Sequence, residues 1–171
     1  MAEKQFHQLD NEVAHFPALG FTAISSVASN TEKVKAQQTS WTPGIVVDGT
    51  EPSGIAYGAN NWGRYMVFGP LVVATFRLAV GTKGSGTGVV AFTGLPFNAL
   101  NQNAGFDTFG GMMVNTNGIS GLNTPILSIS YNNNQITPWN LNTGTRSRWV
   151  YTNFGAAYDF DATVIYLRKD E

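Results

Sequence analysis

From Trp41 onward the chain consists of short apolar runs that are interrupted by Gly, Asn and Pro. The clearest run spans Leu71 to Val80, where every second residue from Val72 to Val80 is apolar and Thr75 and Arg77 fall between them. A period of two places the apolar set on one face of a strand and the polar set on the other. We therefore predict a strand here, with Val72, Ala74, Phe76, Leu78 and Val80 facing a core.

The remaining runs give a chain of predicted strands with no sustained helical periodicity among them. This number of short strands predicts an all-β fold, an antiparallel β-sandwich or jelly roll. The glycine-rich stretch Gly81 to Gly88 is predicted to turn the chain so that the strands on either side form a hairpin. The other predicted strands are Trp41 to Val47, Gly54 to Tyr57, Gly63 to Phe68, Gly88 to Thr93, Gly111 to Asn115, Ile126 to Tyr131 and Tyr158 to Leu167.

The first forty residues differ from the rest, because they hold both histidines and three of the five lysines and lack the strand pattern. Apolar residues between Ala2 and His15 recur at helical spacing, which predicts a short amphipathic helix that ends at Pro17. The polar stretch Ser25 to Thr39 is typical of a linker. We therefore divide the chain into an N-terminal arm and linker, residues 1–40, and a β-sandwich domain, residues 41–171. A helix this short is marginal alone, so we expect the arm to dock on another protein.

Charge is scarce along the chain: charged residues make up 12% of it and the net charge is −1. A soluble domain usually carries about twice that fraction. Asp107 is the only charged residue between Gly84 and Thr145. Two explanations stay open, namely loops that hydrogen-bond to themselves and burial between subunits. The balance of charge argues against a nucleic-acid partner, and the lack of a long apolar segment argues against a membrane span or a secretion signal.

Candidate catalytic chemistry is sparse. The chain has no cysteine and no histidine after His15, so no thiolate or serine–histidine site can form in the β domain. His7 and His15 do not have a standard zinc spacing. Asp159 and Asp161 lie two residues apart, roughly 6 to 7 Å along a strand, which a glycosidase or a calcium site tolerates. Their alternation with Phe160 favours the solvent face of the last strand instead, and we expect no catalytic residue, no cofactor and no metal.

Aromatic rings, amides and arginines gather between Tyr131 and Tyr151, a mixture that suits recognition of a sugar or a receptor. We expect this segment to be rich in loops, because Pro138 and Gly144 interrupt regular pairing. The alternative is that its aromatic residues belong to the core or to a subunit interface. The candidate ligand-binding residues are Tyr131, Asn133, Trp139, Arg146, Arg148, Trp149 and Tyr151.

Several short motifs follow one another in a recognisable order, namely Ser40-Trp-Thr-Pro43, Gly54-Ile-Ala-Tyr57, Gly63-Arg-Tyr65, Lys83-Gly-Ser-Gly-Thr-Gly88 and Gly94-Leu-Pro-Phe97. The order resembles the β-sandwich domains at the C-terminal ends of bacteriophage tail-fibre and tailspike proteins. This resemblance implies a homotrimeric, non-catalytic module on the phage particle. In fibres such a module follows a long shaft, whereas here it follows a forty-residue arm.

The resemblance leads to three hypotheses. The first is a tail-fibre or receptor-binding protein that attaches the particle to a glycan on the host surface. The second is a capsid decoration or cement protein, or a head fibre, that stabilises the phage head. The third, against which the scarcity of acids and histidines weighs, is a polysaccharide-degrading tailspike. The expected partners are further copies of the chain as a homotrimer and other virion proteins bound through the arm. The expected location is the virion, after synthesis in the host cytoplasm.

Overall fold

The computed structural model describes residues 38–100, 109–129, 132–169 of the chain. The predicted arm helix, Ala2 to His15, lies outside the described residues. Within them the regular structure is strand, apart from one short 3-10 helix, η2. Every strand pairing is antiparallel, so the predicted all-β antiparallel class is confirmed. No helix among these residues is long and apolar enough to cross a membrane.

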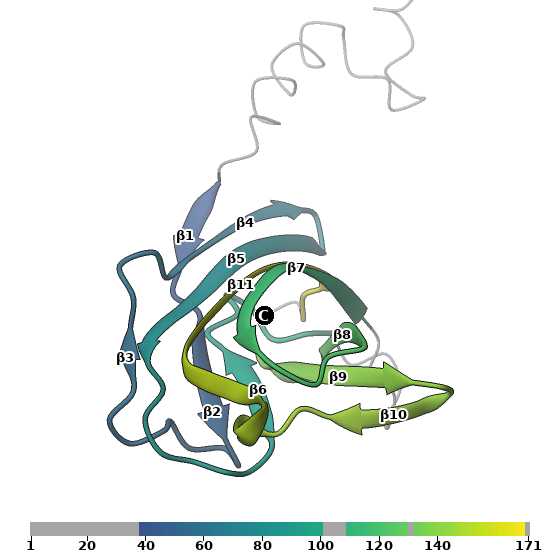
Figure 1. The fold of residues 1–171 in the computed structure, drawn as a ribbon. Helices are drawn as coiled ribbons and strands as arrows, with labels where there is room; N and C mark the ends of the chain where they lie inside the picture. The colour runs from purple at the N-terminus through teal and green to yellow at the C-terminus, as the bar shows by residue number, and fades with distance from the viewer. Residues whose placement is uncertain (1–37, 101–108, 130–131, 170–171) are drawn as a thin grey trace, which may run out of the picture. The chain divides into compact units, whose positions relative to one another are not determined.

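The strands belong to one hydrogen-bonded sheet that curls around the core (Figure 1). Nine of them follow the order β1-β4-β5-β11-β7-β8-β9-β6-β2, while β10 pairs with β9 and β3 pairs with β5. The two layers of the predicted sandwich are therefore halves of one curled sheet. The elements are β1 (Thr39–Trp41), β2 (Gly44–Val47), β3 (Ala56–Tyr57), β4 (Trp62–Phe68), β5 (Leu71–Thr82), β6 (Val90–Thr93), β7 (Phe109–Ile119), β8 (Thr124–Ile129), β9 (Ile136–Asn142), β10 (Thr145–Arg148), η2 (Tyr151–Asn153) and β11 (Phe154–Leu167).

The two ends of this path are close together in space. β1 and β2 are the edge strands, yet only Thr42 and Pro43 separate them along the chain. Proline has no N–H for a ladder, so the predicted strand Trp41 to Val47 breaks at Pro43 and its halves join opposite edges. Trp41 then packs edge-on against Phe76, with ring centroids 5.3 Å apart. This connection brings the curled sheet nearly to closure.

The inner face of the sheet holds the core. Alternation along β5 is as predicted, since Val72, Ala74, Phe76, Leu78 and Val80 are all buried. β11 lies beside β5 and contributes Tyr158, Phe160, Ala162, Val164 and Tyr166 in the same way. Phe92 of β6 closes the core from the opposite side, 4.8 Å from Phe160 between ring centroids. The buried apolar area of these strands stabilises the fold.

The hairpin predicted around Gly81 to Gly88 is wrong. The strands on either side of Gly81 to Gly88 do not form a hairpin, because β5 pairs with β3, β4 and β11 while β6 pairs with β2 and β9. The seven-residue connection from Lys83 to Val89 is long enough to carry the chain across the fold. A backbone hydrogen bond anchors this connection, since Ser85 N–H donates to the Ser53 carbonyl at 2.9 Å.

The segment from Tyr131 to Tyr151 contains two strands, β9 and β10. The prediction that this segment is rich in loops is therefore wrong. A two-residue turn joins them, with positive φ at both Thr143 (41°) and Gly144 (83°). This is the turn geometry that matches the twist of a hairpin, although Asn or Asp is the usual residue where Thr143 stands. Pro138 lies inside β9 and pairs with Leu127 of β8, whereas pairing with β10 begins only at the next residue, Trp139.

Candidate functional site

The β9–β10 hairpin extends away from the rest of the sheet (Figure 1). β10 hydrogen-bonds to β9 alone, so it is an edge strand, and all four of its residues are exposed. Residues on such a projecting edge are accessible to a large ligand or surface. This hairpin is therefore the part of the predicted recognition segment that can meet a partner.

Three of the predicted residues come together on one face of this hairpin. Trp139 pairs directly with Arg148, and Leu141 pairs with Arg146. Directly paired residues and their neighbours two positions along share a face. The guanidinium carbons of Arg146 and Arg148 lie 4.0 and 5.1 Å from the centre of the Trp139 ring, within cation–π distance. We call Trp139, Leu141, Arg146 and Arg148 the hairpin cluster.

The Trp139 ring is held in place from below. Its Nε1–H donates to the Ser128 hydroxyl of β8 at 2.7 Å, and the side chain is half-buried. An indole with a fixed N–H and stacked guanidiniums has little rotational freedom left, so the arginines are presented in a defined orientation.

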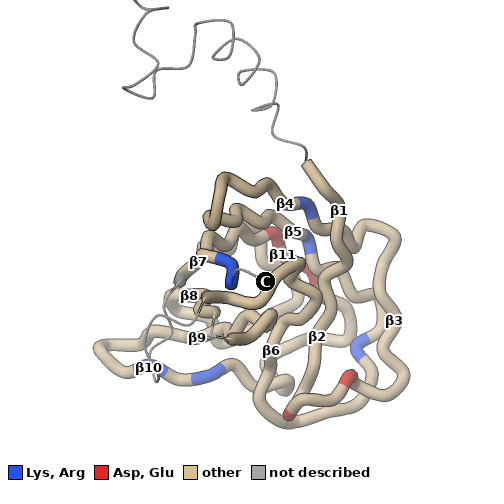
Figure 2. Tube along the Cα trace, turned by 180° about the vertical axis from the view of Figure 1, so that it is seen from behind, with Lys and Arg blue, Asp and Glu red and all other residues tan. Residues whose placement is uncertain are grey.

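The hairpin cluster is positively charged. The sequence has no acidic residue between Asp107 and Asp159, so β8, β9 and β10 carry positive charge alone. Figure 2 shows this basic stretch on β10, in a molecule with few charges elsewhere. Planar guanidiniums bind carboxylate and phosphate groups with two parallel hydrogen bonds. The cluster therefore suits a ligand with acidic groups.

Trp149 and Tyr151 lie elsewhere. Trp149 is 1% exposed and packs edge-on against Phe92 and Phe154. Tyr151 is fully buried, and its hydroxyl donates to the Lys83 carbonyl. Neither side chain is on a surface of this chain, so the core interpretation holds for these two and they cannot contact a glycan.

The other two predicted residues add little to the cluster. Asn133 is half-buried, and its carbonyl accepts from the Ala99 N–H at 2.9 Å, which ties the loop before β9 to the loop after β6. Tyr131 lies outside the described residues.

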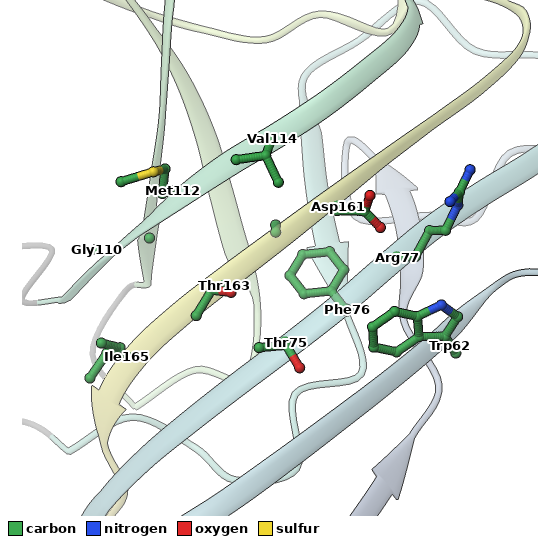
Figure 3. Close-up of a pocket in the computed structure, with 12 residues that line it drawn as sticks. Trp62, Thr75, Phe76, Arg77, Gly110, Met112, Val114, Asp161, Thr163 and Ile165 are labelled. Atoms are coloured by element: carbon green, nitrogen blue, oxygen red, sulfur yellow. The ribbon is translucent and has the colours of Figure 1, made fainter.

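A second exposed surface escaped the sequence prediction. It is the outer face of four adjacent strands, β4, β5, β11 and β7, and it contains a groove of about 860 Å³ (Figure 3). Thr75 and Thr163 form the low middle of the groove, while Trp62 rises on one side and Met112 and Val114 on the other. We call this surface the outer face.

Three charged groups of the outer face, Arg77, Asp159 and Asp161, lie at one end. Arg77 forms an ion pair with Asp159, and this pairing raises the pKa of the Arg77 guanidinium. Asp161 accepts a hydrogen bond from the Asn115 side chain at 3.1 Å. Both aspartates lie on the outer face of the last strand, as their alternation predicted, and each has a partner. The pair considered for glycoside hydrolysis is thus engaged in contacts between strands.

No protein-family model and no curated protein sequence matches the chain. The structure is similar to the crystal structure of the Dettilon tailspike protein, with a TM-score of 0.62 and 14% sequence identity. The similarity covers 78% of this chain and 24% of the tailspike, so this chain spans about a quarter of that protein's length. At this identity the likeness concerns the fold: the β domain has a fold that also occurs in a phage tailspike.

Proposed function

We propose that this protein is a non-enzymatic structural component of a bacteriophage tail, and that it attaches the particle to the host surface through the hairpin cluster. The tailspike-like fold supports a role in the tail. The observation that carries the attachment role is the pair of arginines stacked on Trp139, on a projecting hairpin without acidic residues.

The chemistry of the cluster favours an acidic surface polysaccharide as the ligand. A guanidinium already covers the Trp139 ring, at 4.0 Å from its centre, so a sugar would meet the arginine planes as well as the indole edge. Carboxylate or phosphate groups on the glycan would bind the guanidiniums, and Leu141 would contact the C–H faces of the sugar rings. The ligand we propose is a repeating glycan that carries such groups.

The same fold supports the proposed assembly. We place the protein in the virion as a homotrimer, anchored to other virion proteins through residues 1–40. No catalytic step belongs to this proposal, because Asp159 and Asp161 are held by Arg77 and Asn115. Decoration of the phage head is the competing role, and it becomes an outcome of the experiment below.

The test uses the purified full chain and an acidic polysaccharide from the host surface. Trp139→Ala and Arg148→Ala are each expected to weaken binding about tenfold, which corresponds to about 1.4 kcal/mol. Arg168→Ala is the matched control, because it also removes an arginine stacked on an aromatic ring, here Phe97 at 5.1 Å. The control should bind like the parent.

Unchanged binding by both hairpin variants, in proteins that still fold and assemble, would overturn the attachment role. If the same variants instead lower the thermal stability of the particle, the head-decoration role would replace it.

A further inference from the structure

We infer that the outer face of β4, β5, β11 and β7 is the surface through which copies of this chain contact one another. The inference rests on the proposed self-association and adds the residues that perform it.

The registers show that half of the outer face is apolar. Met66, Val73 and Ile165 form one cross-strand row, since Val73 pairs with both of the others. The next row, at the end of the sheet, consists of Phe68, Leu71 and Leu167. All six are half-buried or exposed. A sheet face that meets water normally carries polar residues at such positions, so these rows are suited to contact with protein.

Exposed large hydrophobic residues concentrate on this face. Among the described residues seven are exposed, and five of them lie on the outer face. Met112 is the most exposed, at 70%. Methionine and aromatic residues are enriched where proteins bind one another. The five are Trp62, Phe68, Met112, Val114 and Ile165.

A second copy fits this face better than a glycan does. The two apolar rows offer no group that could satisfy sugar hydroxyls, whereas another apolar surface would bury them favourably. The charges are complementary as well. Arg64 is exposed on the β4 side of the face and Asp161 lies on the β11 side. The face thus carries opposite charges on its two sides.

A cyclic arrangement uses both sides at once. If three copies turn their outer faces toward a common axis, the β4 side of one copy meets the β7 and β11 side of the next. Arg64 of one copy then approaches Asp161 of its neighbour, and Met112 packs against the row that begins at Met66. Within a single chain the Cα atoms of Arg64 and Asp161 lie about 12 Å apart by sheet spacing, and the ion pair on this face joins Arg77 to Asp159 instead.

The first experiment measures the mass of the full chain by light scattering over a range of concentrations. Ile165→Lys and Met112→Lys are each expected to raise the dissociation constant of the oligomer at least tenfold. Val150→Lys is the matched control, because Val150 is also exposed but lies at the start of η2. Phe68→Lys, at the end of β4, serves as a further variant if either of the first two fails to fold by circular dichroism.

The second experiment exchanges the charges. Arg64→Glu and Asp161→Lys should each weaken association several-fold, and the double variant should recover most of the loss because the attraction is restored across the interface. Recovery in the double variant supports contact between copies.

The outcomes separate the two proposals. If the parent protein is monomeric, the homotrimer and this interface are both overturned, while binding through the hairpin is tested independently. If the parent is oligomeric and the lysine variants associate equally well, the outer face is not the interface but the homotrimer stands. Glycan binding by the outer face would also overturn the inference. In that case Ile165→Lys binds the glycan more weakly, whereas the glycan does not disturb the assembly of the parent and the hairpin variants still bind it.

Discussion

The outer face and the hairpin cluster are both exposed parts of one sheet, yet they are built in opposite ways. The outer face combines side chains of four strands and is largely apolar, with charges of both signs at one end. The hairpin cluster combines two strands and carries positive charge alone. A broad apolar area gains most from contact with another protein, whereas a few fixed cations gain most from an anionic ligand. From this difference we propose different partners for the two surfaces.

Position in the sheet accounts for this difference. β5 and β11 are central strands with neighbours on both sides, so their outer side chains merge into a continuous surface. β10 is an edge strand that pairs with β9 alone. Arginines on such an edge also discourage another strand from pairing with it, so the hairpin can remain exposed without aggregating.

The largest expected effect on the free energy of unfolding comes from comparing a tryptophan of the core with the tryptophan of the hairpin cluster. Trp149→Ala should lower the free energy of unfolding by about 3 to 5 kcal/mol, because it empties a buried site between Phe92 and Phe154. Trp139→Ala should cost much less, since its ring is half-buried, carries two stacked arginines and makes one hydrogen bond to Ser128. Urea unfolding of both variants provides the measurement. Equal losses would mean that the hairpin is an extension of the core.

Alkaline pH is expected to have an intermediate effect on the free energy of unfolding. It acts on tyrosines that are buried in the fold and leaves the charges of both surfaces unchanged. Burial raises the pKa of Tyr57 to about 12, and its hydroxyl donates to the Glu51 carboxylate at 2.8 Å. Burial also raises the pKa of Tyr158 and of Tyr166. The outer face and the hairpin cluster, as defined above, contain no tyrosine.

The direction in which pH changes the free energy of unfolding follows from the order in which unfolded and folded tyrosines ionise. An unfolded tyrosine ionises near pH 10, before the folded one, so the free energy of unfolding stays constant below about pH 10 and falls as the pH rises toward 12. Unfolding curves at pH 9, 10 and 11 measure this, and Tyr57→Phe should flatten the decline. Ligand binding through the hairpin should persist at pH 10.5, because arginine stays charged. Stability that does not change up to pH 11.5 would contradict the argument.

The smallest expected effect concerns the geometry of the hairpin cluster. Arg148→Lys keeps the charge but removes the planar group that lies 5.1 Å from the Trp139 ring. A stacked guanidinium at an exposed site contributes about 0.5 to 1 kcal/mol, so binding should weaken about two- to fivefold, less than for Arg148→Ala. Titration calorimetry with the acidic polysaccharide would measure it. Equal losses for lysine and alanine would show that the planar group matters and the charge does not.

Much of the local structure could be read from the chain. Alternation identified β5 and its buried face, and the apolar runs located most other strands to within a few residues. The failure of alternation near Leu71, Val73 and Ile165, where both faces are apolar, was a signal of the outer face that the sequence prediction did not use. The homotrimer, the arm and its partners remain predictions.

The sequence by itself determined where strands form, because the period of apolar side chains and the breaks at proline and glycine are local properties. Only the tertiary structure decided which strands pair, since hydrogen bonds between distant segments leave no local pattern. Thus the Lys83 to Val89 connection crosses the fold although its composition resembles a hairpin turn. Burial of Trp139 and Trp149 likewise leaves no local pattern, because the two lie ten residues apart in the sequence with the same two arginines between them. Trp139 is half-buried on a projecting hairpin and Trp149 is buried, because burial depends on what the rest of the sheet places over each ring.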